Sequence, residues 1–331
     1  MASKSIDFIA VHAGAGYYPR SDQLAIMKLC RKACVIGGHQ LTIGKSALDS
    51  CVAATVLLED SYLTNAGFGS NLNTEENIEC DAGLMDSRGM EFAGVGAVCG
   101  VKNPIRVARH LLDERRKPRI ASLVRPLVLV GVGAQKFAQN VGAETVEPKA
   151  MVSRRSRQIF KRVLSRVETL QSSNSPPADT VGSISVDSCH TAAASCSSGG
   201  LLLKEPGRIG HATVFGAGCW AEVRGGNICA VSCSGCGEYL IRTHAAQTVA
   251  EALLGSPDSG FRHEILESTL KEKYLNSVML SDYPEEHKLI GCICIFYSCS
   301  VNALEIIWAH NSKVFPICFW SKGIAKAYTA C

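Results

Sequence analysis

The first half of the chain alternates between short apolar runs and stretches with an apolar residue every three to four positions. A short apolar run predicts a buried strand, and the longer spacing predicts a helix with one buried face. We therefore expect a strand, two helices, a strand and two more helices, over 6–11, 21–38, 46–60, 92–101, 104–116 and 131–141 in turn. Ser21 and Ser46 are the expected helix N-caps, and Gly37 with Gly38 is the expected end of the first helix.

The second half of the chain is predicted to form strands, then helices, then strands again. The strands are expected over 180–186, 191–197, 213–221 and 228–232, the helices over 239–254 and 261–274, and the last strands in LIGCICIFYS from Leu289 and ALEIIWAHN from Ala303. Many strand positions hold Ala, Gly, Ser or Cys, which allow two sheets to pack closely. This order of elements indicates an α+β fold with two packed sheets under helical layers.

Residues 144–179 differ in character from the rest of the chain. Apolar residues become sparse and Ser, Pro and basic residues accumulate, so we expect a long surface insertion or linker there. Within it, the segment Arg154–Arg166 places its apolar residues on one helical stripe among many cations. Two interpretations stay open, an exposed helix with a solvated basic face and a nuclear import or nucleic-acid-facing patch.

Composition narrows the class of protein. The chain has 331 residues, of which 47% are hydrophobic and 19% charged, so it can bury a sizeable core in one large domain or two modest ones. Its net charge of +4 gives no reason to expect nucleic acid as a general partner. We find neither a signal-peptide pattern nor an apolar run of about 18 residues, so we expect no membrane partner and a cytoplasmic location, with nuclear entry left to the basic segment.

The 16 cysteines do not form an evident metal site or disulfide framework. Cys233 with Cys236 and Cys292 with Cys294 are the closest pairs, but they lie in apolar or glycine-rich strand patterns rather than at the usual zinc spacing. Phosphate-loop, HExxH and GxSxG motifs are also missing. We expect no metal and no organic cofactor.

An ordered set of short motifs points to one family. The set is HAGAG at 12–16, TNAGFGSNLN at 64–73, ECDAGLMD at 79–86, DTVG at 179–182, SSGG at 197–200, PGRIG at 206–210, GAGCWAE at 216–222 and SGCGE at 234–238. Together these blocks resemble the taspase (threonine aspartase) branch of the type 2 asparaginase family of N-terminal nucleophile hydrolases. The resemblance spans nearly the whole chain except 144–178 and implies a single domain, 1–331, that folds as a four-layer αββα sandwich.

The resemblance implies that Thr180 is the nucleophile and that the chain cuts its own Asp179–Thr180 bond. A threonine hydroxyl is a poor nucleophile until a base takes its proton. Cleavage would give Thr180 a free α-amino group with a pKa of about 7.7–8.0, so the base would come from the same residue. The expected products are an α fragment, 1–179, with a flexible segment at about 144–179, and a β fragment, 180–331. In the family such fragments stay associated and commonly pair further into oligomers.

The same resemblance assigns the remaining site residues. Ser234 and the backbone N–H of Gly235 match an oxyanion hole, and Ser198 matches a hydroxyl that orients the nucleophile. Gly237 would let the backbone approach the substrate closely. Asn65 and Gly67 are expected on a loop near the site.

Arg208 and His211 are the residues from which we infer the class of substrate. The arginine that matches Arg208 holds a substrate carboxylate in the asparaginase branch, where an aspartate at the position of His211 holds the substrate's α-amino group. A peptide substrate has no such ammonium, so His211 favours an endopeptidase that cuts after aspartate in proteins. Two alternatives remain: an L-asparaginase or isoaspartyl-dipeptide hydrolase with the same nucleophile, and an uncleaved, non-catalytic binding protein of the same fold.

Two features depart from the family pattern. The hairpin turn at 187–191 is DSCHT, without the usual Gly-Asn, and the C-terminal end is short, with FPICFWSKGIAKAYTAC as its last residues. Loss of a packing strand at that end would reduce activity while leaving the fold in place.

Overall fold

The structure is a computed structural model that describes residues 6–118, 123–168, 180–256 and 261–330. Its strands form two sheets. The larger sheet has the order β12-β11-β1-β5-β6-β2-β3-β4, with β1 Phe8–His12, β2 Cys80–Asp86, β3 Glu91–Val98, β4 Val128–Val130, β5 Val181–Val186, β6 Ala192–Ser198, β11 Phe315–Ser321 and β12 Ile324–Ala330. The smaller sheet has the order β10-β9-β8-β7, with β7 Cys219–Arg224, β8 Asn227–Gly235, β9 Ile290–Ser298 and β10 Ala303–His310.

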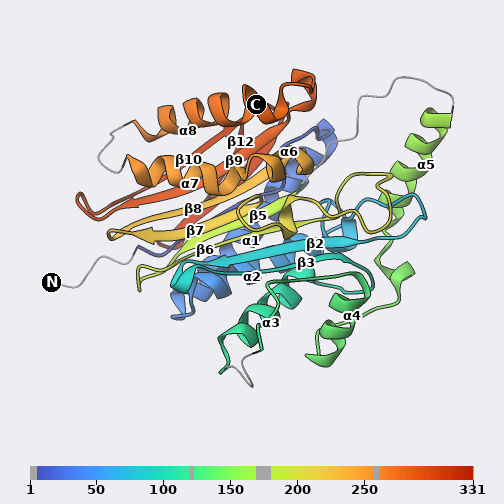
Figure 1. The fold of residues 1–331 in the computed structure, drawn as a ribbon, viewed down its shortest axis with the longest axis horizontal. Coiled ribbons are helices and arrows are strands. Elements are labelled where there is room, and N and C mark those ends of the chain that lie inside the picture. Colours follow the sequence, from blue (N-terminus) through green and yellow to red (C-terminus); the bar gives the residue numbers. More distant parts are fainter. Residues whose placement is uncertain (1–5, 119–122, 169–179, 257–260, 331) are drawn as a thin grey trace.

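Helices cover the outer face of each sheet. Their bounds are α1 Arg20–Thr42, α2 Ala47–Glu59, α3 Pro104–Arg116, α4 Gly131–Asn140, α5 Arg154–Glu168, α6 Gly237–Arg242, α7 Ala245–Gly255 and α8 Arg262–Leu270, which continues as a π-helical turn over Lys271–Leu275. Figure 1 shows α7 and α8 over the smaller sheet and α1, α2 and α3 over the larger one. The α+β class and the four-layer αββα sandwich are therefore confirmed. Within the described residues, none of these helices is both long and apolar enough to cross a membrane.

The interior between the sheets consists largely of small side chains. Ala194 and Cys196 of β6 and Ala230 of β8 are fully buried in one cluster, together with the larger Trp220 and Phe296. Small residues let the two sheets approach closely while the aromatic rings fill the remaining volume. The ends of β5, β6 and β8 consequently lie near one another, and this is where the predicted site residues occur.

The first helix was predicted with the wrong ends. α1 begins after Pro19, so Ser21 lies inside it, and it continues through Gly37 and Gly38 to Thr42. Tertiary packing explains the two glycines, because a Cβ at Gly38 would lie 2.2 Å from the ring of Trp320. These glycines allow close contact with the sheet instead of ending the helix.

The cap of the second helix was predicted correctly. Ser46 Oγ accepts a hydrogen bond from the backbone N–H of Asp49, and the Asp49 carboxylate accepts one from the backbone N–H of Ser46. This reciprocal pair is a capping box, which satisfies two backbone donors at the start of α2.

Two elements of the second half differ from the prediction. The expected helix 239–254 is broken at His244, whose φ of 44° separates α6 from α7. The expected strand 213–221 begins only at Cys219, because His211–Thr213 forms a 3-10 turn and Gly216 has a φ of 78°. Local turn geometry interrupts a pattern that looked continuous in the sequence.

The segment predicted as a surface insertion or linker over 144–179 is folded in its described part, and the helical stripe predicted over Arg154–Arg166 forms a helix. A 3-10 turn, Pro148–Met151, and α5 occupy most of 144–168. Phe160 and Val163 of α5 are buried, which anchors the amphipathic helix on the body of the protein. Residues 169–179, and with them the expected flexible approach to Asp179, lie outside the described residues.

Both departures from the family pattern are accommodated by the fold. In the β5–β6 turn the Asp187 carboxylate accepts hydrogen bonds from the backbone N–H groups of Cys189 and Thr191, and His190 has a φ of 57°. At the end of the chain, β11 pairs along the full length of β1, and β12 pairs with β11. The hairpin and the edge of the larger sheet are therefore both formed.

Candidate active site

Thr180 lies immediately before β5 and is 1% exposed. Its Oγ1 donates a hydrogen bond to Ser198 Oγ at 3.2 Å, and its backbone N–H donates one to Ser234 Oγ at 3.3 Å. Three residues predicted from the sequence thus meet at the ends of β5, β6 and β8. Asp179, the other half of the expected cleavage site, lies outside the described residues.

Ser234 and Gly235 have the features required of an oxyanion-binding pair. Ser234 Oγ accepts hydrogen bonds from the backbone N–H groups of Thr180 and Ala15, the latter at 3.0 Å. With its acceptor positions occupied, the hydroxyl retains its own proton for a substrate oxygen. Gly235 has a φ of 151°, and a Cβ there would lie 2.1 Å from the carbonyl oxygen of Leu289, so only glycine fits.

Asn65 secures the segment that follows Ser198. Its side-chain amide donates to the Gly200 carbonyl at 2.9 Å, and its backbone carbonyl accepts from Gly199 N–H at 2.8 Å. The backbone N–H of Gly200 in turn donates to Ser198 Oγ at 3.0 Å. The predicted proximity of Asn65 to the site is therefore correct. Gly67 instead shapes the loop, with a φ of 54° and a Cβ position 2.4 Å from the Glu59 carbonyl oxygen.

Sequence patterns did not single out His12 within HAGAG. His12 is fully buried at the end of β1, opposite Gly182 of β5, and its Nε2 lies 2.9 Å from Ser232 Oγ. Burial and the neighbouring His211 lower the pKa of His12 to about 3, although the backbone of Thr180 acts in the opposite direction. The ring is therefore neutral at physiological pH and lies next to Thr180.

Glu59 is a second residue that the sequence did not indicate. Burial raises the pKa of Glu59 to about 8, despite hydrogen bonds from Ser197 Oγ at 2.7 Å and from the backbone N–H of Ile105 at 3.0 Å. The carboxyl group is accordingly protonated at neutral pH. It ties the end of α2 to the residue before Ser198, and so helps to position the hydroxyl that contacts Thr180.

Arg208 is held through one edge of its guanidinium, while its Nη1 makes no hydrogen bond to a described residue. Its Nε and Nη2 donate to the two carboxylate oxygens of Glu238, at 2.8 and 2.6 Å. Three glycines lie against the guanidinium nitrogens. A Cβ added at Gly200 would lie 2.9 Å from Arg208 Nη1, one at Gly210 would lie 3.0 Å from Nη1, and one at Gly237 would lie 2.7 Å from Nη2. Glu238 holds the orientation of the fork, and on its Nη1 side the Lys204 side chain adjoins the same glycine, Gly200.

His211, a predicted substrate-binding residue, has an imidazole side chain at the position where the asparaginase branch is expected to have a carboxylate. It is 3% exposed, and its Nε2 lies 3.2 Å from the carbonyl oxygen of Cys233. Burial and the charge of Arg208 lower the pKa of His211 to about 4. A neutral imidazole in this position carries no charge to balance a substrate ammonium group.

The buried cysteines Cys233, Cys292 and Cys294 lie close together on β8 and β9 as free thiols. Cys233 Sγ lies 3.6 Å from Cys292 Sγ, which lies 3.5 Å from Cys294 Sγ. The hydrogen bond with Cys292 and burial hold the pKa of Cys233 well above its usual range. Across the described ranges, no group of three or more His, Cys, Asp or Glu side chains has the arrangement needed to hold a metal ion.

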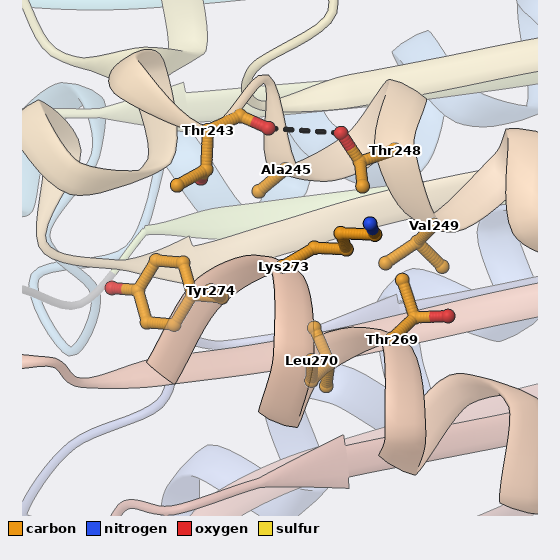
Figure 2. Close-up of a pocket in the computed structure, with 8 residues that line it drawn as sticks. All are labelled: Thr243, Ala245, Thr248, Val249, Thr269, Leu270, Lys273 and Tyr274. Atoms are coloured by element: carbon orange, nitrogen blue, oxygen red, sulfur yellow. Dashed lines mark hydrogen bonds between the residues drawn. The ribbon is translucent and has the colours of Figure 1, made fainter. Parts of the chain in front are cut away.

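A small cavity lies between α7 and the end of α8, away from the hydroxyl groups of Thr180, Ser198 and Ser234. Its volume is about 10 Å³, which is room for about one water molecule. Figure 2 shows its lining, in which Thr248 Oγ1 donates to the Thr243 carbonyl at 2.9 Å and Lys273 lies across the space. A larger hollow of about 460 Å³ opens on the outer surface between α1, α2 and α3. Neither hollow is lined by Thr180, Ser198 or Ser234.

Comparison with known proteins agrees with the geometry of the site. The family model described as "Asparaginase" matches residues 5–257. The chain is 33% identical over 253 residues to an isoaspartyl peptidase of Escherichia coli (strain K12), with 73% of this chain and 75% of that protein covered. It is 32% identical to a plant-type L-asparaginase of Pyrococcus abyssi and 31% identical to an isoaspartyl peptidase/L-asparaginase of Xenopus laevis, with 78% and 74% of those proteins and 73% of this chain covered. The chain therefore belongs to the type 2 asparaginase family of N-terminal nucleophile hydrolases.

Proposed function

We propose that this hydrolase is a self-processing threonine endopeptidase that cuts proteins after aspartate, with Thr180 as its nucleophile. The observation that carries the proposal is the set of hydroxyl groups at three strand ends, in which Thr180 contacts both Ser198 and Ser234. Family membership supports the reaction class, since hydrolysis of an amide bond is common to the names of the relatives. The preference for aspartate in a polypeptide is our own inference.

Self-processing would use the same groups before the α-amine exists. Oγ1 of Thr180 attacks the carbonyl carbon of Asp179, the C–N bond between the two residues breaks, and the nitrogen gains the proton that the hydroxyl loses. Water then hydrolyses the resulting ester, which leaves a carboxyl group on Asp179 and both an amine and a hydroxyl on Thr180. Ser234 and Gly235 would stabilise the oxyanion in both steps, by about 3 kcal/mol for each donor.

The preference for a peptide rests on the neighbours of Arg208. Its free Nη1 side suits the side-chain carboxylate of a substrate aspartate. His211 is neutral and buried, so the site has no carboxylate at that position for a free α-ammonium group. The chain's own Asp179–Thr180 sequence provides the first example of such a substrate.

A peptide assay tests this proposal. The substrate is a labelled peptide with the sequence NSPPADTVGS of residues 174–183, compared with the same peptide carrying asparagine in place of aspartate. We expect the mature protein to cut the first peptide between aspartate and threonine, and a Thr180→Ala variant to cut neither. No cleavage of any aspartyl peptide by a fully processed protein would refute the endopeptidase proposal.

Isoaspartyl-peptide or L-asparagine hydrolysis is the second candidate, and the printed names of the relatives favour it. It would use Thr180, Ser234 and Arg208 in the same roles, with Arg208 holding an α-carboxylate. Release of ammonia from L-asparagine, or of amino acids from a β-aspartyl dipeptide, at rates above those for the aspartyl peptide would establish it in place of the first candidate.

After cleavage the two fragments, 1–179 and 180–331, should remain together. β5 begins the second fragment, yet it lies between β1 of the first fragment and β6, so separation would open the middle of the larger sheet. We propose a stable αβ unit that pairs further, which size-exclusion chromatography with light scattering will test.

Nuclear import and the non-catalytic binding alternative both remain predictions. They rest on the exposed cations of α5, among them Arg157 and Lys161. A cell-based localisation assay tests nuclear import.

A further inference from the structure

Lys204 is a buried cation with few partners. It lies on the loop after β6, is 4% exposed, and donates one hydrogen bond, to the Glu79 carbonyl oxygen at 2.8 Å. An ammonium group has three donors, and burying its charge is unfavourable unless an anion lies nearby. Among the residues that the structure describes, no carboxylate forms an ion pair with it. Two of the three donors of its ammonium group therefore make no hydrogen bond to a described residue.

Lys204 and Arg208 meet at the same glycine. A Cβ at Gly200 would lie 2.9 Å from Arg208 Nη1 and 3.2 Å from Lys204 Nζ, so the two cationic groups pack against one point of the backbone. The N–H of Gly200 donates to Ser198 Oγ, which accepts the hydrogen bond of Thr180. The pair of cations is thus linked to the nucleophile through one residue of backbone and one hydroxyl.

The nearest acidic side chains, Asp81 and Glu238, do not use the remaining donors of Lys204 and Arg208. Asp81 is fully buried, and its two oxygens accept from the backbone N–H groups of Ala97 at 2.8 Å and Gly210 at 2.7 Å. Burial raises the pKa of Asp81, while the charge of Lys204 is the largest opposing influence. Glu238 is engaged with the opposite edge of Arg208. Each cation therefore has one carboxyl group beside it, Asp81 near Lys204 and Glu238 on Arg208, while the Nη1 side of Arg208 and two donors of Lys204 make no hydrogen bond to a described residue.

We propose that Lys204 and Arg208 together hold the side-chain carboxylate of the substrate aspartate, and that Lys204 makes the enzyme select aspartate over asparagine. The proposal rests on the endopeptidase function proposed above. A carboxylate accepts from both cations, whereas the amide of asparagine presents only one oxygen and turns an N–H group toward a positive charge. A site built to pair a specific polar group discriminates strongly against an analogue that leaves its donors unpaired.

The test compares Lys204→Met and Lys204→Arg with the wild type and with a control, Lys32→Met, at an exposed position of α1. The substrates are the NSPPADTVGS peptide and its asparagine counterpart. Lys204→Met should raise KM for the aspartyl peptide by about 10- to 100-fold, as expected for a lost hydrogen bond to a charged group, while kcat changes by less than about twofold. KM for the asparaginyl peptide should stay constant, Lys204→Arg should retain most of the preference, and Lys32→Met should match the wild type.

An unchanged KM of Lys204→Met for the aspartyl peptide would overturn the proposal. An equal rise in KM for both peptides would also overturn it, because it would indicate a structural role only. If that variant fails to fold, the wild type decides the matter through the ¹⁵N signal of Lys204 Nζ. That signal should shift on addition of N-acetyl-L-aspartate and not of N-acetyl-L-asparagine, and an unchanged signal would refute the assignment. If the processed wild type cuts no aspartyl peptide, the function proposed above is wrong and this inference falls with it.

Discussion

Replacement of Ser234 by alanine separates the two tasks of its hydroxyl group. In the uncut chain Ser234 Oγ accepts from the N–H groups of Ala15 and Thr180, both of which are 1% exposed. Ser234→Ala leaves each buried donor without this acceptor, which costs about 1–3 kcal/mol per group in the free energy of unfolding. It also removes one donor from the developing oxyanion, so self-processing should slow by about 10²- to 10³-fold.

The assay follows the fragments 1–179 and 180–331 by intact mass over time at neutral pH, with urea denaturation of the uncut chain measured in parallel. Ser185→Ala is the matched control, because Ser185 is equally buried and donates to the Phe8 carbonyl at 2.9 Å but has no contact with Thr180. It should lower stability by about 1 kcal/mol and leave the processing rate unchanged. Wild-type processing by Ser234→Ala, or an equal slowing by Ser185→Ala, would refute the reasoning.

Three further predictions concern the surroundings of the nucleophile. Gly182→Ala should destabilise the fold by about 1–3 kcal/mol in urea denaturation, because its Cβ would lie 2.5 Å from His12 Nε2, and unchanged stability would contradict this packing. The pKa of His211 is lowered from 6.5 to about 4, so the unfolded chain binds more protons at this residue below about pH 6.5, whereas Glu59, with its pKa raised to about 8, acts in the opposite direction; the free energy of unfolding of the wild type should therefore fall relative to that of His211→Gln as pH drops from 7 to 4, and parallel profiles of the two proteins would argue against a buried neutral ring. Glu238→Ala should raise KM for the aspartyl peptide by no more than about fivefold with little change in kcat, because the Glu238 side chain is 47% exposed and its ion pair with Arg208 is correspondingly weak; a large loss of kcat would instead place Glu238 in the chemistry.

The layers of the fold were largely accessible from the sequence. Strand and helix periodicity is a local property, so α3, Pro104–Arg116, and the capping box at Ser46 were predicted at or near their observed positions. The errors arose where distant contacts override local preference. Gly38 looks like a helix end until Trp320, far along the chain, packs against it. The single left-handed residue His244 divides one helical pattern into two helices.

The candidate site also has residues that the sequence predicted and residues that it did not. Thr180, Ser198 and Ser234 stand in motifs that identify the family, and their proximity follows once strand ends are brought together. His12 and Lys204 carry no local signal, because a buried ring or a buried cation is defined by what surrounds it in three dimensions. The partner of a cation is likewise set by the fold, so the sequence indicated a carboxylate for Arg208 but gave no sign of Glu238 or of the glycines around the fork.

The central claim is that Thr180 is a nucleophile generated by self-cleavage. Intact mass of the purified wild type and of Thr180→Ala, after incubation at neutral pH, tests it most directly. The account predicts two wild-type fragments, one ending at Asp179 and one beginning at Thr180, and an uncut Thr180→Ala chain. A wild-type chain that stays whole, or a Thr180→Ala chain cut at the same bond, would contradict it.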